Sequence, residues 1–316
     1  MALWATFRLS YNDPNFNNIL RMCRAADRAD WNAVVEVAQE STVVPTRLEV
    51  LLRNLALQRL GTAGDTMFKY ADGDTPYNCP RQQQLLRLMG ARILYYYYGK
   101  VNYSYRWCME DMVEYGLRPT YLNYMHRCAL LNDEPALARK YADVLAAIPF
   151  YGEFTEPSRS EANAVNPADT TAIRSLMNYN DLLDGDNGLV EVYLLNSFAT
   201  TNGGSREMVE LSLQCCLILK DIDGFWQHFI PLLPTFGQHI PTHYQEAALL
   251  FSQLEGKYDI SQLPIDPTLA ERFHHLIEES SANANRGDEA NAELLRPAYG
   301  DTYWYYYFFV TGLKTN

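Results

Sequence analysis

Apolar residues recur at steps of three and four along most of the chain. In the first sixty positions this spacing links Phe16 with Ile19 and Cys23, and it continues through the leucine-rich stretch 48–57. Residues spaced in this way lie on one face of an α-helix. Prolines stand at or just before the starts of these segments and glycines where they stop, which suits the first turn and the end of a helix. Alternating strand patterns are nearly absent, so the sequence predicts an all-α fold.

The segment 122–150 has the pattern of a tetratricopeptide repeat, which consists of a helix, a tight turn and a second helix. Ala138 and Ala142 are small, as the close crossing of two antiparallel helices requires. We place the turn at Asp133 and the end of the unit at Pro149. Comparable helix–turn–helix breaks precede it at Ala29, Gly61 and Gly99.

These four breaks are 32, 38 and 34 residues apart, close to the ~34-residue period of such repeats. Four irregular units are therefore expected within residues 15–150, in a helical-repeat lobe that spans 1–150. Residues 151–167 are polar and aperiodic, and we interpret them as a connection to a second helical lobe, 151–316, that continues the array. Because one helix pair cannot bury its apolar face alone, the expected fold is a tetratricopeptide-like superhelical array of antiparallel helix pairs with a concave surface.

Two aromatic clusters, Tyr95–Tyr98 and Tyr303–Phe309, stand out in a chain with 23 tyrosines. Consecutive helical residues point to all sides of the helix, so some of these rings must be buried. The rings could fill the gaps between stacked helices, or they could form a stacking platform for sugars or a partner peptide, since tyrosine has an apolar face and a polar tip. We favour the first interpretation because each ring buries a large area.

A concave binding surface would be lined by the first helix of each pair. With the repeats in the register given above, four side chains are expected on that side and form the candidate binding site: Tyr96, Tyr97, Asn123 and Arg127.

The composition is acidic. Asp and Glu outnumber Lys and Arg by 38 to 26, which gives a formal net charge of −12 and a pI near 5.0. Such a surface repels phosphate backbones and no basic patch offsets it, so we expect no nucleic-acid partner. The longest apolar stretches, such as Tyr303–Val310, are far shorter than the ~20 residues that span a bilayer. Met1–Tyr11 lacks the basic and apolar regions of a signal peptide.

The histidines do not predict a metal site. His239, His243 and Glu246 are close in sequence, but Pro241 prevents a continuous helix from placing both histidines on one face. His243 is instead expected to pack beside the helix that starts near Pro241. The adjacent histidines 274–275 diverge by about 100° on a helix. We therefore expect neither a metal nor a cofactor.

Motifs of catalysis are also missing, including the G-x-S-x-G elbow, the phosphate loop and the dinucleotide fingerprint. Neighbouring acids such as Glu110 and Asp111 are expected to diverge into solvent, which does not suit paired-carboxylate chemistry. No two cysteines have C-x-x-C spacing, and we expect unpaired thiols in the core. The six cysteines are Cys23, Cys79, Cys108, Cys128, Cys215 and Cys216.

Several segments carry a resemblance to a known family: 54–70, 106–116, 137–151, 240–251 and 299–309. They resemble the C-terminal part of an uncharacterised family of bacterial multi-spanning membrane proteins, in which several transmembrane helices precede a soluble tetratricopeptide-like region. The resemblance extends from about Phe16 onward. It implies that this chain is the soluble domain of a protein of the cell envelope, on either the cytoplasmic or the periplasmic side. It also implies that a membrane anchor lies before Met1, and it brings no catalytic residues.

Together these features predict a non-enzymatic interaction scaffold that binds a protein or peptide partner on a concave helical-repeat surface. Membrane contact is expected only through an anchor that this chain lacks. The alternative function is glycan binding by exposed tyrosines.

Overall fold

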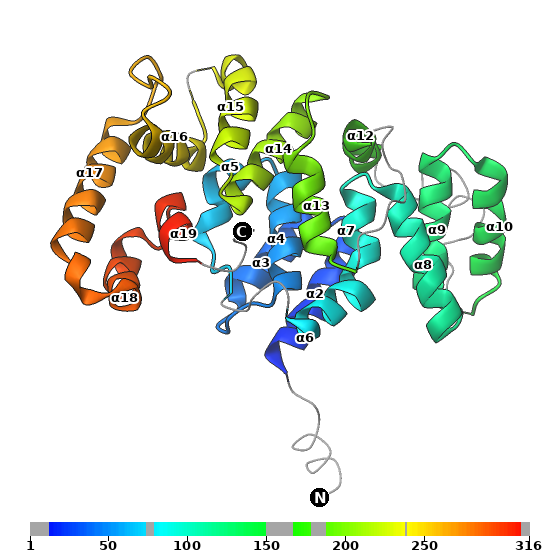
Figure 1. Cartoon of the computed structure of the whole chain (residues 1–316). Coiled ribbons are helices and arrows are strands. Elements are labelled where there is room, and N and C mark those ends of the chain that lie inside the picture. The colour runs from blue at the N-terminus through cyan, green and yellow to red at the C-terminus, as the bar shows by residue number, and fades with distance from the viewer. Residues whose placement is uncertain (1–12, 74–78, 150–166, 178–187, 238, 311–316) are drawn as a thin grey trace, which may run out of the picture.

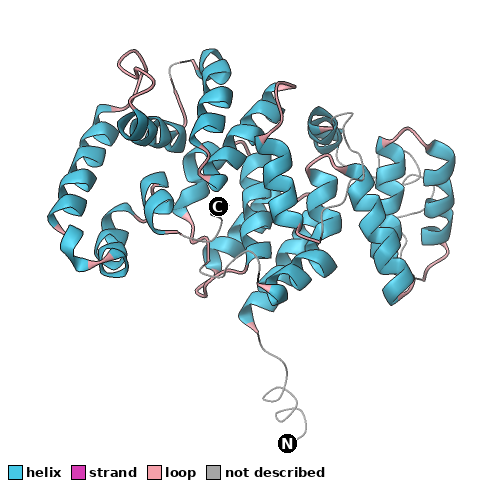
Figure 2. Ribbon diagram, in the orientation of Figure 1, coloured by secondary structure: helices cyan, strands magenta, loops and turns pink. Residues whose placement is uncertain are grey.

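The structure, a computed structural model, describes residues 13–73, 79–149, 167–177, 188–237 and 239–310. Its regular elements are helices, and no strand occurs within these ranges (Figure 2). The prediction of an all-α fold is confirmed.

The helices before residue 150 are α2 (Pro14–Asp27), α3 (Trp31–Glu40), α4 (Arg47–Arg59), α5 (Ala63–Thr66), α6 (Pro80–Leu85), α7 (Ala91–Tyr97), α8 (Val101–Tyr115), α9 (Pro119–Leu131) and α10 (Pro135–Ala146). Those after it are α12 (Pro167–Leu176), α13 (Val190–Ala199), α14 (Arg206–Leu219), α15 (Ile222–Phe236), α16 (Thr242–Glu255), α17 (Pro267–Ala282), α18 (Asp288–Tyr299) and α19 (Tyr303–Phe309). Short elements are the 3₁₀ helices η1 (Met67–Lys69) and η5 (Ala284–Arg286) and the π-helix η2 (Leu86–Gly90).

Helix starts follow local chemistry. Proline occupies the first turn of α2, α6, α9, α10 and α17, where its missing N–H is not needed. Helix α4 begins with a capping box. The backbone N–H of Glu49 donates to Thr46 Oγ1 (3.3 Å), and the backbone N–H of Thr46 donates to Glu49 Oε2 (2.6 Å). Two N–H groups that lack intrahelical acceptors are thereby satisfied.

One type of turn closes several helix pairs. At the Asp133 turn the N–H of Glu134 donates to the carbonyl of Ala129 (2.8 Å), and the N–H of Asp133 donates to that of Leu130 (3.2 Å). This is the Schellman motif, in which one residue adopts a left-handed conformation. The same bonds and a positive φ recur at Ala29, Gly61, Gly99 and Lys220. All four predicted helix breaks are therefore turns of this type, and Lys220 adds a fifth.

The helices joined by these turns pack side by side, as α2 with α3, α7 with α8, α9 with α10 and α14 with α15 (Figure 1). The turn at Gly61 is followed only by the four-residue α5, so that pair is truncated. Successive pairs are joined through contacts of α3 with α4 and of α8 with α9. Helix α16 packs on α5 and α4 packs on α7, so segments distant in sequence also meet.

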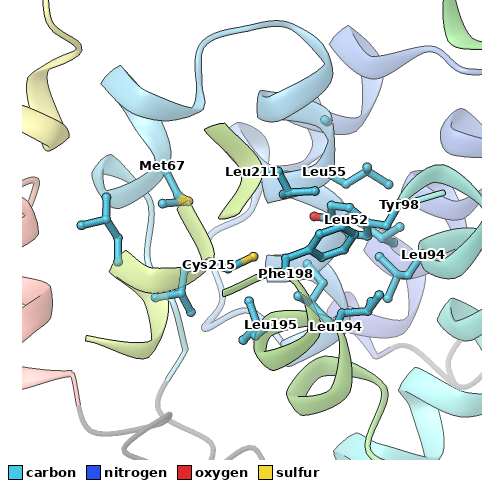
Figure 3. Close-up of a cluster of buried hydrophobic side chains, with 14 of the residues drawn as sticks. Leu52, Leu55, Met67, Leu94, Tyr98, Leu194, Leu195, Phe198, Leu211 and Cys215 are labelled. Carbon is cyan, nitrogen blue, oxygen red and sulfur yellow. The ribbon is translucent and has the colours of Figure 1, made fainter. Parts of the chain in front are cut away.

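The core is continuous across the two parts of the chain. Figure 3 shows Leu52 and Leu55 of α4 and Leu94 of α7 beside Phe198 of α13 and Leu211 of α14. The same buried apolar cluster contains residues from α2 through α19. Most of the expected connection, residues 151–166, lies outside the described residues. The apolar core does not divide at this point.

Buried polar bonds also join the two parts. The guanidinium of Arg47 in α4 forms a bidentate pair with Glu191 in α13, where Nε donates to Oε2 (3.1 Å) and Nη2 donates to Oε1. Arg47 is 5% exposed and Glu191 is 0% exposed. Trp31 Nε1 donates to Asp169 Oδ1 at 3.1 Å. Removing one partner of the Arg47 pair would leave an uncompensated buried charge, so loss of either side chain should be strongly destabilising.

The cysteines are all free, and Cys79 alone of the six is only half-buried. Burial raises the pKa of Cys23 to about 12, so this thiol stays protonated. The prediction of unpaired core thiols is confirmed for the five buried residues.

Candidate functional site

Three of the four residues expected on a concave surface are in the core instead. Tyr96 is 0% exposed, Tyr97 is 1% exposed and Arg127 is 9% exposed. Asn123 is half-buried. Helix α7 is surrounded by α2, α4, α8 and α9, so its tyrosines have no solvent-facing side. The expectation that Tyr96, Tyr97 and Arg127 line an accessible binding surface is corrected by this burial.

These buried side chains donate hydrogen bonds to the C-terminal end of α2. Tyr97 Oη donates to the carbonyl of Ala26 (2.7 Å), and Arg127 Nη2 donates to the carbonyl of Asp27 (2.9 Å). Tyr124 Oη donates to Asp27 Oδ1 at 2.7 Å. The last carbonyls of a helix lack intrahelical donors and carry a partial negative charge, so a guanidinium is a favourable partner. Burial raises the pKa of Tyr97 to about 12, which keeps its hydroxyl a donor at neutral pH.

The C-terminal aromatic cluster is also largely buried. Tyr303 Oη donates to the carbonyl of Leu217 (3.1 Å), and Tyr306 Oη donates to that of Ile218 (2.7 Å). The ring centroid of Phe68 lies 5.0 Å from that of Tyr303 and 4.6 Å from that of Tyr306. These contacts dock α19 onto α14 and η1. The rings of both clusters thus mainly fill space between helices, whereas Phe308 at the end of the second cluster is 46% exposed.

His243 is part of a buried hydrogen-bond network. The backbone N–H of Phe68 donates to His243 Nε2 (3.3 Å), so Nδ1 carries the proton and donates to Glu246 Oε2 (2.8 Å). The same carboxylate oxygen accepts the backbone N–H of Tyr303 (2.8 Å). His243 therefore packs at the start of α16, as predicted. Among the described residues no group of three His, Cys, Asp or Glu side chains could hold a metal ion.

The candidate site that the structure provides is an apolar groove of about 240 Å³ between α16, α17 and α19. These helices lie at one end of the molecule, far from α8 and α10 (Figure 1). Leu250, Phe273 and Leu276 form its floor and are 2%, 4% and 3% exposed. Leu254 and Phe308 line its rim and are 49% and 46% exposed. A buried apolar floor therefore continues into an exposed apolar rim.

Buried polar contacts fix the walls of the groove. The ring of Phe273 packs on Trp304 with centroids 4.9 Å apart, and Trp304 Nε1 donates to the carbonyl of Glu246 (2.7 Å). At the end of α19, Lys220 Nζ donates to the carbonyls of Tyr307 (2.8 Å) and Val310 (2.6 Å). A lysine in this position satisfies carbonyls that no helical N–H reaches. Phe308 is thus carried on a helix anchored at both ends.

Two exposed acidic residues are next to lining residues in the sequence, although neither lines the groove itself. Glu255 follows the rim residue Leu254, and Glu278, which lies 3.7 Å from His275 Nδ1, follows the lining residue Ile277. Lys257 is also exposed in this region, but its ammonium pairs with Asp223 at 2.8 Å. The groove therefore has a mainly apolar lining, in a chain whose formal net charge is −12.

The sequence predicted a second helical lobe, but it did not bring α16, α17 and α19 together as a groove. The contact of α17 with α19 depends on side chains more than thirty positions apart, such as Phe273 and Trp304. One local signal was available. Phe308 and Phe309 are adjacent at the end of a short helix, so both rings cannot turn inward.

One family model matches the sequence over residues 1–310, and its description is "Family of unknown function (DUF6057)". The chain belongs to this family. The match covers nearly the whole chain, in agreement with the expected membership of an uncharacterised family. No helix in the described part of this DUF6057 member is long and apolar enough to cross a membrane. No curated protein and no solved structure matches the chain.

Proposed function

We propose that this protein is a non-enzymatic interaction scaffold, built as a tetratricopeptide-like superhelical array, that binds an amphipathic helix of a partner protein in the groove between α16, α17 and α19. The proposal keeps the function predicted from the sequence and moves the site. The observation that carries it is the pair Leu254 and Phe308, exposed on the rim of a buried apolar floor. Exposed apolar side chains that gather at one groove are typical of interaction sites in folded proteins.

The size of the groove favours a peptide over a small molecule. Its volume of about 240 Å³ is below the roughly 300–1,000 Å³ of pockets that enclose drug-sized ligands. A bulky side chain of a partner helix fits such a space, and further anchors one helical turn away would lie along the rim. Recognition of this kind uses apolar anchors at positions i, i+3, i+4 and i+7.

The acidic charge of the chain favours basic flanks on that helix. The whole chain has a formal net charge of −12, and the exposed Glu255 and Glu278 each follow a groove-lining residue in the sequence. Complementary charge speeds encounter and suppresses wrong partners more than it adds affinity. The expected partner is therefore a basic amphipathic helix. Its location at the cell envelope, beside a membrane anchor, stays a prediction from the family resemblance.

The test uses a fluorescently labelled amphipathic helical peptide of leucine and lysine and measures anisotropy on titration with the full chain. A second peptide of alanine and lysine with the same charge separates apolar docking from electrostatic attraction. We expect saturable binding of the leucine peptide only. Phe308→Asp and Leu254→Asp should each weaken it about tenfold or more, because each places a charge at an apolar contact.

Ile230→Asp is the matched control, since Ile230 on α15 is 45% exposed and lies outside the groove. Equal binding by the Phe308→Asp, Leu254→Asp and Ile230→Asp variants would refute the groove as the site. Binding of a panel of oligosaccharides to the full chain is measured in a further titration. A saturable response to a sugar together with no peptide binding would support the glycan alternative instead.

A further inference from the structure

A second, polar pocket lies away from the groove, between helix α8 and the segment formed by α6 and η2. It has a volume of about 170 Å³. Helix α8 contributes Trp107, Glu110, Asp111, Glu114 and Tyr115, and the facing segment contributes Gln84, Arg87 and Leu88. The spacing 107, 110, 111 and 114 places these side chains on one face of α8. The pocket has no role in the function proposed above.

Asp111 is the unusual member of this set. It is 4% exposed, although sequence reasoning expected it to point into solvent beside Glu110. Within the described residues its carboxylate forms no hydrogen bond and no ion pair at bonding distance. Polar groups that a folded chain covers are nearly always paired. The carboxylate of Asp111 has no donor among the described residues and faces the pocket that it lines, so its donor would have to come from the pocket.

The neighbouring acids already have partners at one oxygen each. Glu110 Oε1 forms an ion pair with Arg106 Nε (3.2 Å), and Glu114 Oε1 accepts a hydrogen bond from the hydroxyl of Tyr115 (2.8 Å). Each retains a second oxygen. The guanidinium of Arg87 lies over the ring of Trp107, 5.1 Å from its centroid, and makes no bonding contact with Asp111 in the structure. Three carboxylates against one arginine give the lining a formal charge of −2.

We propose that this pocket binds a primary ammonium group, with Asp111 as its main partner and Glu114 and Glu110 as secondary acceptors. An ammonium donates three hydrogen bonds and carries the charge that the lining lacks. A metal ion is disfavoured because the described residues hold no suitable group of three ligands. The volume of about 170 Å³ holds a short alkyl chain behind the ammonium.

The same chemistry has two sources, a free alkylamine and a lysine side chain of a partner protein. The experiment therefore titrates n-butylammonium and a short neutral-backbone peptide with one lysine, using calorimetry at low salt. The peptide acetylated on its lysine Nζ is the uncharged comparison. Tighter binding of the peptide than of butylammonium assigns the pocket to a partner's lysine, and equal binding assigns it to a free amine.

Asp111→Asn should weaken binding of either probe about tenfold or more, and Glu114→Gln several-fold, since a hydrogen bond to a charged group is about twice as strong as a neutral one. Arg87→Gln should strengthen binding, because it removes a like charge from the lining. Glu36→Gln changes the charge by the same amount at an exposed position on α3 and should have no effect. Thermal melting checks that each variant is folded.

Three results would overturn the proposal. The first is the absence of saturable binding of both amines at millimolar concentration. The second is equal affinity for the wild-type chain and Asp111→Asn. The third is weaker binding after Arg87→Gln, which would indicate that Arg87 donates to the ligand and that the ligand is a neutral hydroxyl compound or an anion.

Discussion

Two aromatic clusters of similar composition have different surroundings in this protein. The rings of Tyr95–Tyr98 are buried on every side, with exposures of 0%, 0%, 1% and 7%. In Tyr303–Phe309 the first four rings are buried, but Phe308 is 46% exposed on the rim of the groove. Helix α7 contacts α2, α4, α8 and α9, whereas α19 contacts α16 and α18 and leaves its last turn on the rim of the groove. The exposure of a ring therefore depends on which side of its helix is covered and not on the sequence of the cluster alone.

The largest loss of stability is expected from a substitution on the buried side of the second cluster. Trp304 is 0% exposed and its Nε1 donates to the carbonyl of Glu246. Trp304→Ala should lower the free energy of unfolding by about 3–5 kcal/mol, because it leaves a large cavity beneath the groove. Urea unfolding followed by circular dichroism measures this. A loss below about 1 kcal/mol would mean that α19 is not part of the core.

A matched pair of variants tests the first cluster. Tyr97 donates to the carbonyl of Ala26, whereas the buried hydroxyl of Tyr96 has no hydrogen-bond partner among the described residues. Tyr97→Phe should cost about 1 kcal/mol because the Ala26 carbonyl loses one donor and keeps the N–H of Ala29, and Tyr96→Phe should be neutral or slightly stabilising. The comparison by urea unfolding needs only these two single-atom changes. Equal losses would contradict the assigned capping of α2.

Asp111 extends the comparison to a buried group without a partner. Burial raises the pKa of its carboxyl to about 6, with further increases from Glu114 and Glu110 and opposing effects of Arg92 and Arg87. Tyr115, Tyr121 and Cys108 are also near this carboxyl. Because the pKa is higher in the folded chain, ionisation disfavours folding: the penalty is absent below about pH 4 and complete above about pH 6.

The Asp111→Asn variant should therefore match the wild type near pH 3.5 and be more stable by about 1 kcal/mol at pH 7. The full shift corresponds to a larger value at ~1.4 kcal/mol per pKa unit, which we reduce for solvent screening at the pocket mouth. Unfolding free energies measured across this range in amine-free buffer provide the test. A pH-independent difference would show that the carboxyl titrates normally.

The smallest effect is expected at the exposed end of the second cluster. Phe308→Ser should change the free energy of unfolding by no more than about 0.5 kcal/mol, since surface substitutions rarely do more. It should nevertheless remove most of the binding of the leucine peptide. Pairing this variant with Trp304→Ala separates binding from folding within one helix. A loss of stability as large as that of Trp304→Ala would make Phe308 a core residue.

The parts of the fold that were predicted correctly depend on local chemistry. The breaks at Ala29, Gly61, Gly99 and Asp133 follow from helical periodicity and from which residues stop it, and all four are Schellman turns. Apolar spacing and prolines at helix starts likewise depend on neighbours within one or two turns. The fold class could therefore be predicted from the sequence, and so could the packing of His243 at the start of α16.

The candidate site could not be predicted from the sequence because it depends on contacts between distant segments. Tyr97 and Ala26 are 71 positions apart, and Arg47 and Glu191 are 144 positions apart. Helical spacing identifies which residues share a face, but it does not say what covers that face. The filling of gaps by the Tyr95–Tyr98 rings was favoured correctly, but Tyr96, Tyr97 and Arg127 were also named as candidates for a concave surface, and Asp111 was expected in solvent. The exposed rim of the groove became visible only when α16, α17 and α19 were placed together.

The contacts of Phe68 with Tyr303 and Tyr306 constrain the order in which the chain acquires its structure. During synthesis the ribosome releases Phe68 more than two hundred residues before the rings that cover it. The early helix pairs can form their turns at once, but this part of their interior stays open to water until the final helix has emerged. A nascent or shortened chain that stops before Tyr303 therefore exposes apolar surface that favours aggregation. Chaperones and proteases would encounter the chain in this state.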